Sequence, residues 1–263
     1  MKRKPYRIKK RRPVWRTKLF WRIFIIAMFL GEVLYSVYFL EPFQIKNIEI
    51  SGNEKIKTAS IEGIIQNQIN KTVMFFQTKS IFLIAPLKIE KIVLTDFPQI
   101  ATVSLKRKFP NTLVVDIIER KPAAIFCQTD NCFNLDKEGI VFEPNLARAG
   151  LVKIMNLVSG PDIKLGEEVV GKDLLNKILE IGDKVENDIK ILLDKISVVS
   201  DDRLNVGISD GWEIYFDPQK DLSWQFTKLK AVLDKEIPQE KRKNLEYIDL
   251  RFGNFAPYKY KQS

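Results

Sequence analysis

The feature that most restricts the fold of this chain is a long apolar run near its N-terminus. From Ile23 to Leu40 the sequence reads IFIIAMFLGEVLYSVYFL, with Glu32 as the one ionisable residue. Extended back to Leu19, the run is long enough to cross about 30 Å of hydrocarbon as a helix. We therefore expect residues 19–40 to form a single transmembrane helix.

Positive charge is concentrated just before this run. Residues 1–22 hold 11 Lys or Arg and no acidic residue, whereas the rest of the chain carries 32 basic and 33 acidic residues. A nucleic-acid-binding domain would keep a basic face of its own, so we expect no nucleic-acid partner. The positive-inside rule places a basic tail, residues 1–18, in the cytoplasm and the C-terminal part outside.

A cleaved signal peptide is the alternative to a retained anchor. Its apolar region would be shorter and would end in small residues at a cleavage site. Here the run ends in Val-Tyr-Phe-Leu-Glu-Pro, which favours the anchor. Glu32 is costly near mid-membrane, and two interpretations stay open for it: contact with a partner helix, or a side chain that faces protein or reaches toward the surface.

The first exported segment, residues 43–120, predicts a small α+β domain. A strand candidate at 43–50 precedes one helix that Thr58 or Ser60 can cap and that runs through Ile65, and a second helix that begins at Pro86. Two alternating strands follow, on either side of the Phe-Pro-Asn turn at 109–111. This order predicts two helices packed on a three-stranded sheet.

The second exported segment, residues 121–252, predicts a mostly β domain with helices. It begins after Glu-Arg-Lys-Pro at 119–122 and contains several short strand candidates. Amphipathic helices are expected at 172–185 and 219–236, and a last strand at 245–252. We expect residues 253–263 to form a flexible tail.

The sequence lacks the residues on which most catalytic sites depend. It contains no histidine, which removes Ser-His-Asp and Cys-His systems and the common zinc sites. A Ser–Lys pair would need no histidine, but no motif points to one. There is no Gly-rich phosphate loop either. We predict no catalytic residue, no metal, no cofactor and no small-molecule substrate.

The two cysteines, Cys127 and Cys132, flank a predicted hairpin turn. Strand partners across a tight turn can reach the spacing that a disulfide needs, and the compartment outside the membrane is often oxidising. A disulfide and a pair of free thiols are both left open, with a metal site as a third reading.

Several segments together resemble the FtsQ/DivIB bacterial cell-division family. FQIKNIEISGNEKI at 43–56 is similar to the opening strand and Gly turn of its POTRA domain. FPQIATVSLKRKFPNTLVVDIIERKPAAIF at 97–126 and LDKEGIVF at 135–142 resemble the stretch where the β domain begins. YIDLRF at 247–252 resembles the end of that domain. The fold class that the resemblance implies is α+β: one transmembrane helix, a POTRA-type domain and a second, mostly β domain.

The resemblance also implies a function. Members of that family are non-enzymatic scaffolds of the division machinery that hold FtsB/FtsL-type membrane proteins, and a partner adds a strand to the C-terminal edge of the β domain. By position, Leu245–Phe252 would be that edge. The residues expected to contact the partner are Tyr247, Leu250, Arg251 and Phe252, although core packing is an equal reading for Leu250. The expected location is the cell membrane, single-pass, at the division septum.

Three other functions remain as alternatives, one of which is an anchored adaptor for an unrelated membrane complex. A membrane-anchored POTRA adaptor of a secretion or outer-membrane assembly complex would share the first domain, but such chains carry several POTRA units or a barrel. An exported hydrolase is disfavoured because the chain has no histidine and no nucleophile motif.

Overall fold

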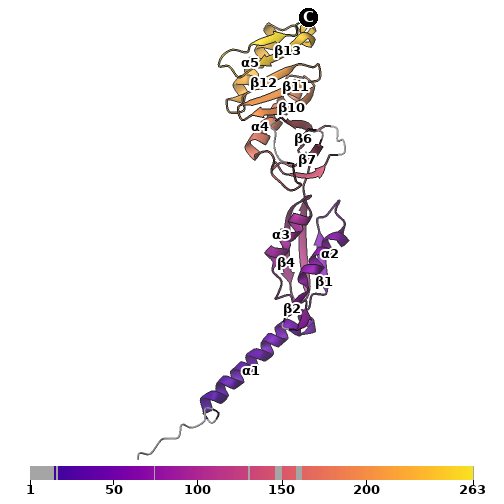
Figure 1. Ribbon diagram of the computed structural model, residues 1–263, viewed down its shortest axis with the longest axis vertical. Coiled ribbons are helices and arrows are strands. Elements are labelled where there is room, and N and C mark those ends of the chain that lie inside the picture. Colours follow the sequence, from indigo (N-terminus) through magenta and orange to yellow (C-terminus); the bar gives the residue numbers. More distant parts are fainter. Residues whose placement is uncertain are drawn as a thin grey trace, which may run out of the picture. The chain divides into compact units, whose positions relative to one another are not determined.

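The computed structural model describes residues 15, 17–73, 75–129, 131–145, 150–157 and 162–262 (Figure 1). The chain forms two compact units. Unit 1 consists of residues 1–93 and 102–117, and unit 2 consists of residues 94–101 and 118–263. Each unit has its own sheet and its own buried core.

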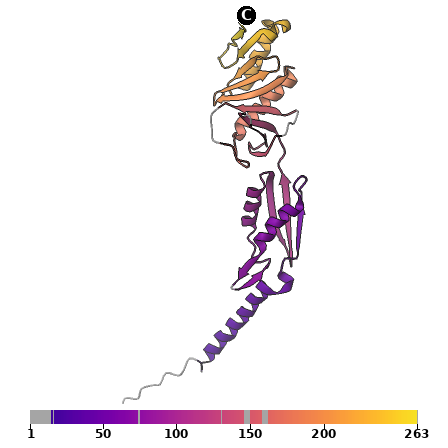
Figure 2. The ribbon, with the colours of Figure 1, turned by 45° about the vertical axis from the view of Figure 1, so that its right-hand side comes forward.

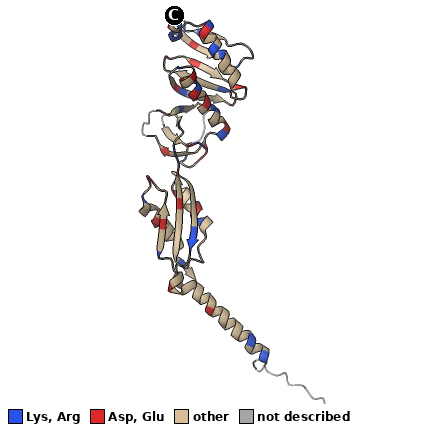
Figure 3. Ribbon diagram, turned by 180° about the vertical axis from the view of Figure 1, so that it is seen from behind, with Lys and Arg blue, Asp and Glu red and all other residues tan. Residues whose placement is uncertain are grey.

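Unit 1 begins with the apolar helix that the sequence predicts. Helix α1 (Lys18–Phe39) has 22 residues and none of them is buried. Thr17 caps it, because its Oγ1 accepts a hydrogen bond from the Phe20 amide at 3.3 Å. Among the described residues, α1 is the one helix long and apolar enough to cross a membrane. Figure 3 shows that its charged residues gather mainly at its N-terminal end.

The rest of unit 1 contains two helices and a three-stranded sheet, as the sequence predicts. The strand order is β1-β5-β4, and β1 pairs with β5 in parallel. Alternating residues of the strands and one stripe of each helix form the core, with Ile61, Val93 and Leu113 fully buried. The elements are η2 (Glu41–Phe43), β1 (Asn47–Ser51), α2 (Thr58–Ile69), α3 (Pro86–Asp96), β4 (Ile100–Lys108) and β5 (Thr112–Glu119).

A small hairpin between the two helices was not predicted. Strands β2 (Lys71–Val73) and β3 (Phe76–Thr78) are antiparallel, with Val73 opposite Phe76. Each strand has three residues, too few to produce a clear alternation of apolar and polar residues in the sequence.

Unit 2 is built on a nine-stranded mixed sheet. Its order is β14-β13-β12-β11-β10-β9-β6-β7-β8, so β9 is inserted between two hairpins and pairs in parallel with both neighbours. The strands are β6 (Ala124–Gln128), β7 (Asn131–Leu135), β8 (Val141–Pro144), β9 (Val152–Asn156), β10 (Leu193–Ser200), β11 (Arg203–Ile208), β12 (Glu213–Phe216), β13 (Leu245–Asp249) and β14 (Tyr258–Tyr260).

Two helices cover one face of this sheet (Figures 1 and 2). Helix α4 (Lys172–Asp183), which continues as η3 (Lys184–Asp188), contributes Leu175, Ile178 and Ile181 to the core. Helix α5 (Leu222–Lys235) contributes Phe226, Leu229 and Leu233, and η4 (Gln239–Asn244) leads from it into β13. The fold class expected from the sequence, α+β with a mostly β second domain, is confirmed.

One expectation for the end of the chain is wrong. Residues 258–260 form strand β14, within the segment 253–263 that was expected to be a flexible tail. The amide of Asp249 donates to the carbonyl of Pro257 at 2.8 Å, and the amide of Lys261 donates to the carbonyl of Asn244 at 2.8 Å. A three-residue strand is too short to have a sequence pattern of its own, and pairing with β13 is what orders it.

Candidate protein-binding edge

The C-terminal edge of the large sheet is formed by β14, not by β13. Strand β13 has a partner on each side, because it pairs in parallel with β12 and antiparallel with β14. The expectation that Leu245–Phe252 would be the exposed edge is therefore wrong. Among the described strands of this sheet, β14 and β8 each have a neighbour on one side only.

The backbone of β14 presents two residues to the open side. The carbonyl of Pro257 and the amide of Lys261 both bond to the β13 segment. Since successive residues of a strand point their N–H and C=O groups to opposite sides, those of Tyr258 and Tyr260 point outward. The Lys259 side chain is exposed and forms a 2.7 Å ion pair with Glu246, whereas the two tyrosine rings pack against the core.

A buried lysine holds the loop that leads into β14. Lys228 on α5 is 6% exposed, and its Nζ donates to the carbonyl oxygens of Leu250, Phe252 and Phe255 at 2.6, 2.8 and 3.1 Å. Burial lowers the pKa of this ammonium group below its ordinary value. The Trp224 indole adds a 3.1 Å hydrogen bond to the Gly253 carbonyl. These contacts fix a loop that has no regular secondary structure of its own.

An apolar groove lies between this loop and helix α5, next to β14. Its volume is about 910 Å³. The wall from the helix includes Trp224 and Val232, and the wall from the loop includes Phe252, Phe255 and Tyr258. Phe252 is 54% exposed and Phe255 is 77% exposed. An apolar side chain of a strand that pairs with β14 would be buried in this groove.

The structure separates the four residues that the sequence analysis assigned to partner contact. Leu250 is 1% exposed and belongs to the core, so its side chain cannot reach a partner. Tyr247 lies on the sheet face opposite the helices and stacks on Tyr215 with ring centroids 5.0 Å apart. Phe252 is the exposed member of the set and lines the groove.

Arg251 lies on the same face of the sheet as Tyr247, and its side chain is hydrogen-bonded to Asp249 of β13. Its Nε and Nη2 donate to the two carboxylate oxygens of Asp249 at 2.9 and 2.7 Å, and these bonds raise the pKa of Arg251 above its ordinary value. Arg203, which the sequence analysis did not single out, places its guanidinium 4.4 Å from the ring centre of Tyr215. Its only signal in the sequence was its place at the start of a strand.

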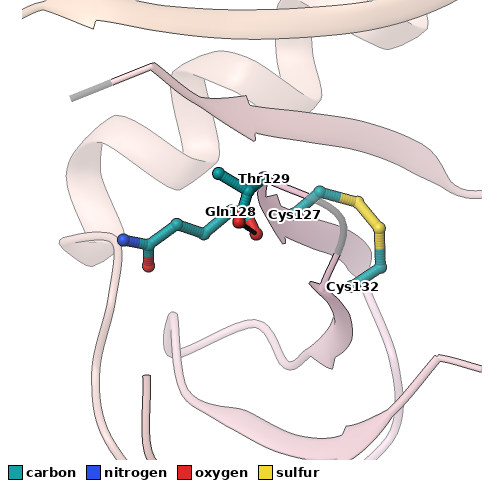
Figure 4. Close-up of a disulfide and its surroundings, with 4 residues drawn as sticks. All are labelled: Cys127, Gln128, Thr129 and Cys132. Carbon is teal, nitrogen blue, oxygen red and sulfur yellow. Dashed lines mark hydrogen bonds between the residues drawn. A yellow bond between two sulfur atoms is a disulfide. The ribbon is translucent and has the colours of Figure 1, made fainter. Parts of the chain in front are cut away.

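The two cysteines are cross-strand neighbours in the β6–β7 hairpin (Figure 4). The Sγ atoms of Cys127 and Cys132 are 2.01 Å apart, and the Cα atoms are 4.1 Å apart. In the turn between them, Thr129 has a φ of 52° and its hydroxyl donates to the Gln128 carbonyl at 2.6 Å. The pair lies on β6 and β7, several strands away from β14, so it does not belong to the candidate edge.

The remaining candidate, Glu32, lies on the exposed surface of α1. Its contact with a partner helix stays a prediction. Within the described ranges, no group of three or more Cys, Asp or Glu side chains could hold a metal ion.

Comparison with known proteins gives two family matches that together span most of the chain. The model of the POTRA domain, FtsQ-type, matches residues 43–120. The model of the cell division protein FtsQ/DivIB, C-terminal, matches residues 125–251. The two matches follow the order in which the POTRA-type fold and the large sheet occur along the chain.

Individual relatives carry the same names. The chain is 30% identical over 160 residues to cell division protein DivIB of Clostridium acetobutylicum, which covers 58% of this chain and 59% of the relative. It is 29% identical over 189 residues to DivIB of Clostridium botulinum strain Hall, covering 71% of this chain and 66% of the relative. It is also 29% identical over 118 residues to cell division protein FtsQ of Novosphingobium aromaticivorans, covering 45% and 33%. The chain thus spans less than two thirds of these relatives' length.

Both halves of the fold and the relatives point to one conclusion: the chain belongs to the FtsQ/DivIB family of cell division proteins.

Proposed function

We propose that this protein is a non-enzymatic scaffold of the division machinery, anchored by α1, and that a membrane-bound partner of the FtsB/FtsL type adds a strand to β14. The observation that carries the proposal is the open edge at the C-terminal end of the nine-stranded sheet. The outward N–H and C=O groups of Tyr258 and Tyr260 offer hydrogen bonds to an incoming strand.

Two further features support this edge as the binding site. The groove beside β14 can take an apolar side chain of the partner, which would give selectivity beyond backbone pairing. The Lys228 contacts hold the edge and the groove in one arrangement before a partner arrives. Less ordering is then required on binding, and this favours affinity.

The opposite edge is a weaker candidate. Strand β8 ends at Pro144, which carries no N–H to donate to a further strand. The family is one of cell division proteins, which argues against the secretion-adaptor reading of the POTRA domain. For the anchor, we propose that the basic tail stays in the cytoplasm and that both units lie outside it, by the positive-inside rule.

Site-specific photo-crosslinking in the native cell tests the proposal. A photoreactive amino acid at Lys259 or Phe252 should capture a small single-pass division protein, because both side chains are exposed beside the edge. Leu192, which is 74% exposed elsewhere in unit 2, is the matched control position and should capture none. Capture from Leu192 but not from Lys259, in correctly inserted protein, would reject the edge assignment.

A backbone substitution gives a second test. Tyr260→Pro removes an outward N–H, whereas Tyr260→Ala removes the same side chain and keeps that N–H. We expect capture from Phe252 to be lost in the Pro variant and largely retained in the Ala variant. Equal losses in both would show that the Tyr260 ring, which packs against the core, matters more than the outward N–H, and would contradict strand addition.

A further inference from the structure

Unit 1 exposes two aromatic side chains that the proposed scaffold function does not use. Phe75 is 93% exposed and Phe76 is 67% exposed, both in the β2–β3 hairpin. Large apolar side chains side by side in water are a sign of a surface that is covered in the working protein. The question is what covers them.

The hairpin is bonded directly to the end of α1. The Thr78 hydroxyl donates to the Tyr38 carbonyl, and the Ser80 hydroxyl donates to the Val37 carbonyl at 2.8 Å. Gln44 also donates to the Tyr38 carbonyl, at 2.9 Å, while its Oε1 accepts from the Lys79 amide at 2.7 Å. These side chains satisfy carbonyl groups that the last turn of a helix leaves without intrahelical partners. The hairpin is therefore held at the C-terminal end of the helix.

Ring contacts continue the surface of α1 into the hairpin. The centroid of Phe76 lies 5.9 Å from that of Phe39, the last residue of α1. At 1.5 Å per residue, α1 is about 33 Å long, close to the ~30 Å thickness of the hydrocarbon core. A helix of this length places Phe39 at the boundary between acyl chains and headgroups. Phe76 must then lie at the same boundary.

The same end of unit 1 carries further aromatic residues that are exposed or partly exposed. Phe43, Phe82 and Phe109 form a chain of ring contacts, each pair with centroids 5.4 Å apart. Phe109 is 57% exposed. Phe43 follows Phe39 by four residues, which limits their separation to about 14 Å. Aromatic side chains are enriched at this depth of a bilayer.

We propose that Phe75 and Phe76 insert into the outer-leaflet interface of the membrane that α1 crosses, so that the β2–β3 hairpin is a second membrane contact. The inference rests on the anchoring part of the proposed function. Lipid is favoured over a protein occupant because the surface continues the membrane-spanning helix without a break. Residues 70–79 also contain Lys71 and Lys79 and no acidic residue, which suits lipid phosphates.

A second contact changes what the anchor does. A single helix lets unit 1 tilt relative to the bilayer, whereas a helix and a hairpin that both touch the bilayer restrict that tilt. The hairpin would thereby set which face of unit 1 is turned toward the membrane and which faces are left for other proteins.

Depth-dependent fluorescence quenching tests the inference in the full-length protein. The protein is reconstituted into phospholipid vesicles, with an environment-sensitive fluorescent amino acid placed in turn at positions 75, 29 and 118. Phe29 is in the middle of α1, and Ile118, which is 63% exposed, lies near the far end of β5. Quenchers are attached to lipids at a shallow or a deep position, and iodide serves as the aqueous quencher.

The reporter at 75 should be quenched most by the shallow lipid quencher and should be shielded from iodide relative to 118. The reporter at 29 should be quenched by the deep lipid quencher. If 29 is quenched by lipid while 75 is as open to iodide as 118, the inference is overturned and the anchor stands. If 29 is not quenched by lipid, the anchor and the inference both fail. Phe76→Ser should weaken the lipid quenching at 75, whereas Gln77→Ser on the opposite face of β3 should leave it unchanged.

Discussion

The lysine beneath the candidate edge allows a quantitative test of how that edge is held. Lys228→Met keeps the length and apolar stem of the side chain but removes the ammonium group that serves three carbonyl oxygens. The Leu250 carbonyl is buried and would lose this charged donor. The other two acceptors belong to exposed residues, so water can replace the lysine there.

The expected loss of stability follows from the different exposure of the three carbonyl groups. One hydrogen bond from a charged donor is worth about 1.5–3 kcal/mol when its acceptor stays buried. Water can hydrogen-bond to the other two carbonyl groups, which limits the cost of losing their donor. The variant also no longer buries an ammonium charge, and this offsets part of the lost stability. We expect a local destabilisation of about 2 kcal/mol, which corresponds to roughly thirtyfold faster opening of the segment.

Hydrogen exchange measured by mass spectrometry reads this opening directly. Peptides covering residues 245–262 should exchange faster in Lys228→Met, while peptides from β4 and β5 of unit 1 should not change. Lys230→Met is the matched control, since Lys230 is an exposed lysine on the same helix. Its effect should stay below about 1 kcal/mol. Equal exchange in Lys228→Met and the unchanged protein would refute the view that this lysine holds the edge.

Three further predictions concern other parts of the fold. Arg120→Met leaves the buried Asp136 carboxylate without its ion-pair partner and should destabilise unit 2 by about 3 kcal/mol. Lys121→Met, at the exposed next residue, should cost less than about 0.5 kcal/mol. Chemical unfolding of both variants measures the two losses. Thiol labelling of freshly extracted protein should find Cys127 and Cys132 oxidised. Because the closed loop is short, reducing the pair should lower stability by about 2 kcal/mol or less, and a loss twice as large would contradict the entropic account. Hydrogen bonds from Lys106 and, to a smaller extent, Ser51 lower the pKa of Asp116 below 3.8. The carboxylate therefore stabilises unit 1 above pH 3.8, and this contribution is lost as the pH falls through the lowered pKa. Thermal unfolding of Asp116→Asn at several pH values should lack this part of the acid sensitivity.

The sequence predicted the elements whose patterns are long. The apolar run of α1, the alternation in β4 and β5 and the amphipathic stripe of α4 each extend over eight residues or more, so the periodicity is clear. Gly52 after β1 could also be read from its Ser-Gly-Asn turn: its φ is +83°, and a Cβ there would overlap the Ile117 carbonyl.

The elements missed by the sequence analysis are all short. Strand β9 has five residues and is defined by parallel pairing with β6 and β10, each separated from it in the sequence by other elements. Strand β14 has three residues and was hidden in an apparent tail. The candidate site was therefore placed one strand too far inward, because nothing local distinguishes a covered strand such as β13 from an edge.

The position of β14 within the chain has a consequence for timing. If both units lie outside the membrane, as proposed, a chain that crosses it from its N-terminal end delivers α1 first, then unit 1, and β14 after the other described strands of the large sheet. If the partner binds to β14, a chain that stalls during export or is cut short before β14 can already be inserted and partly folded. Such a chain still lacks the strand edge that the partner needs. Recruitment of the partner would then report that the chain has been exported as far as β14.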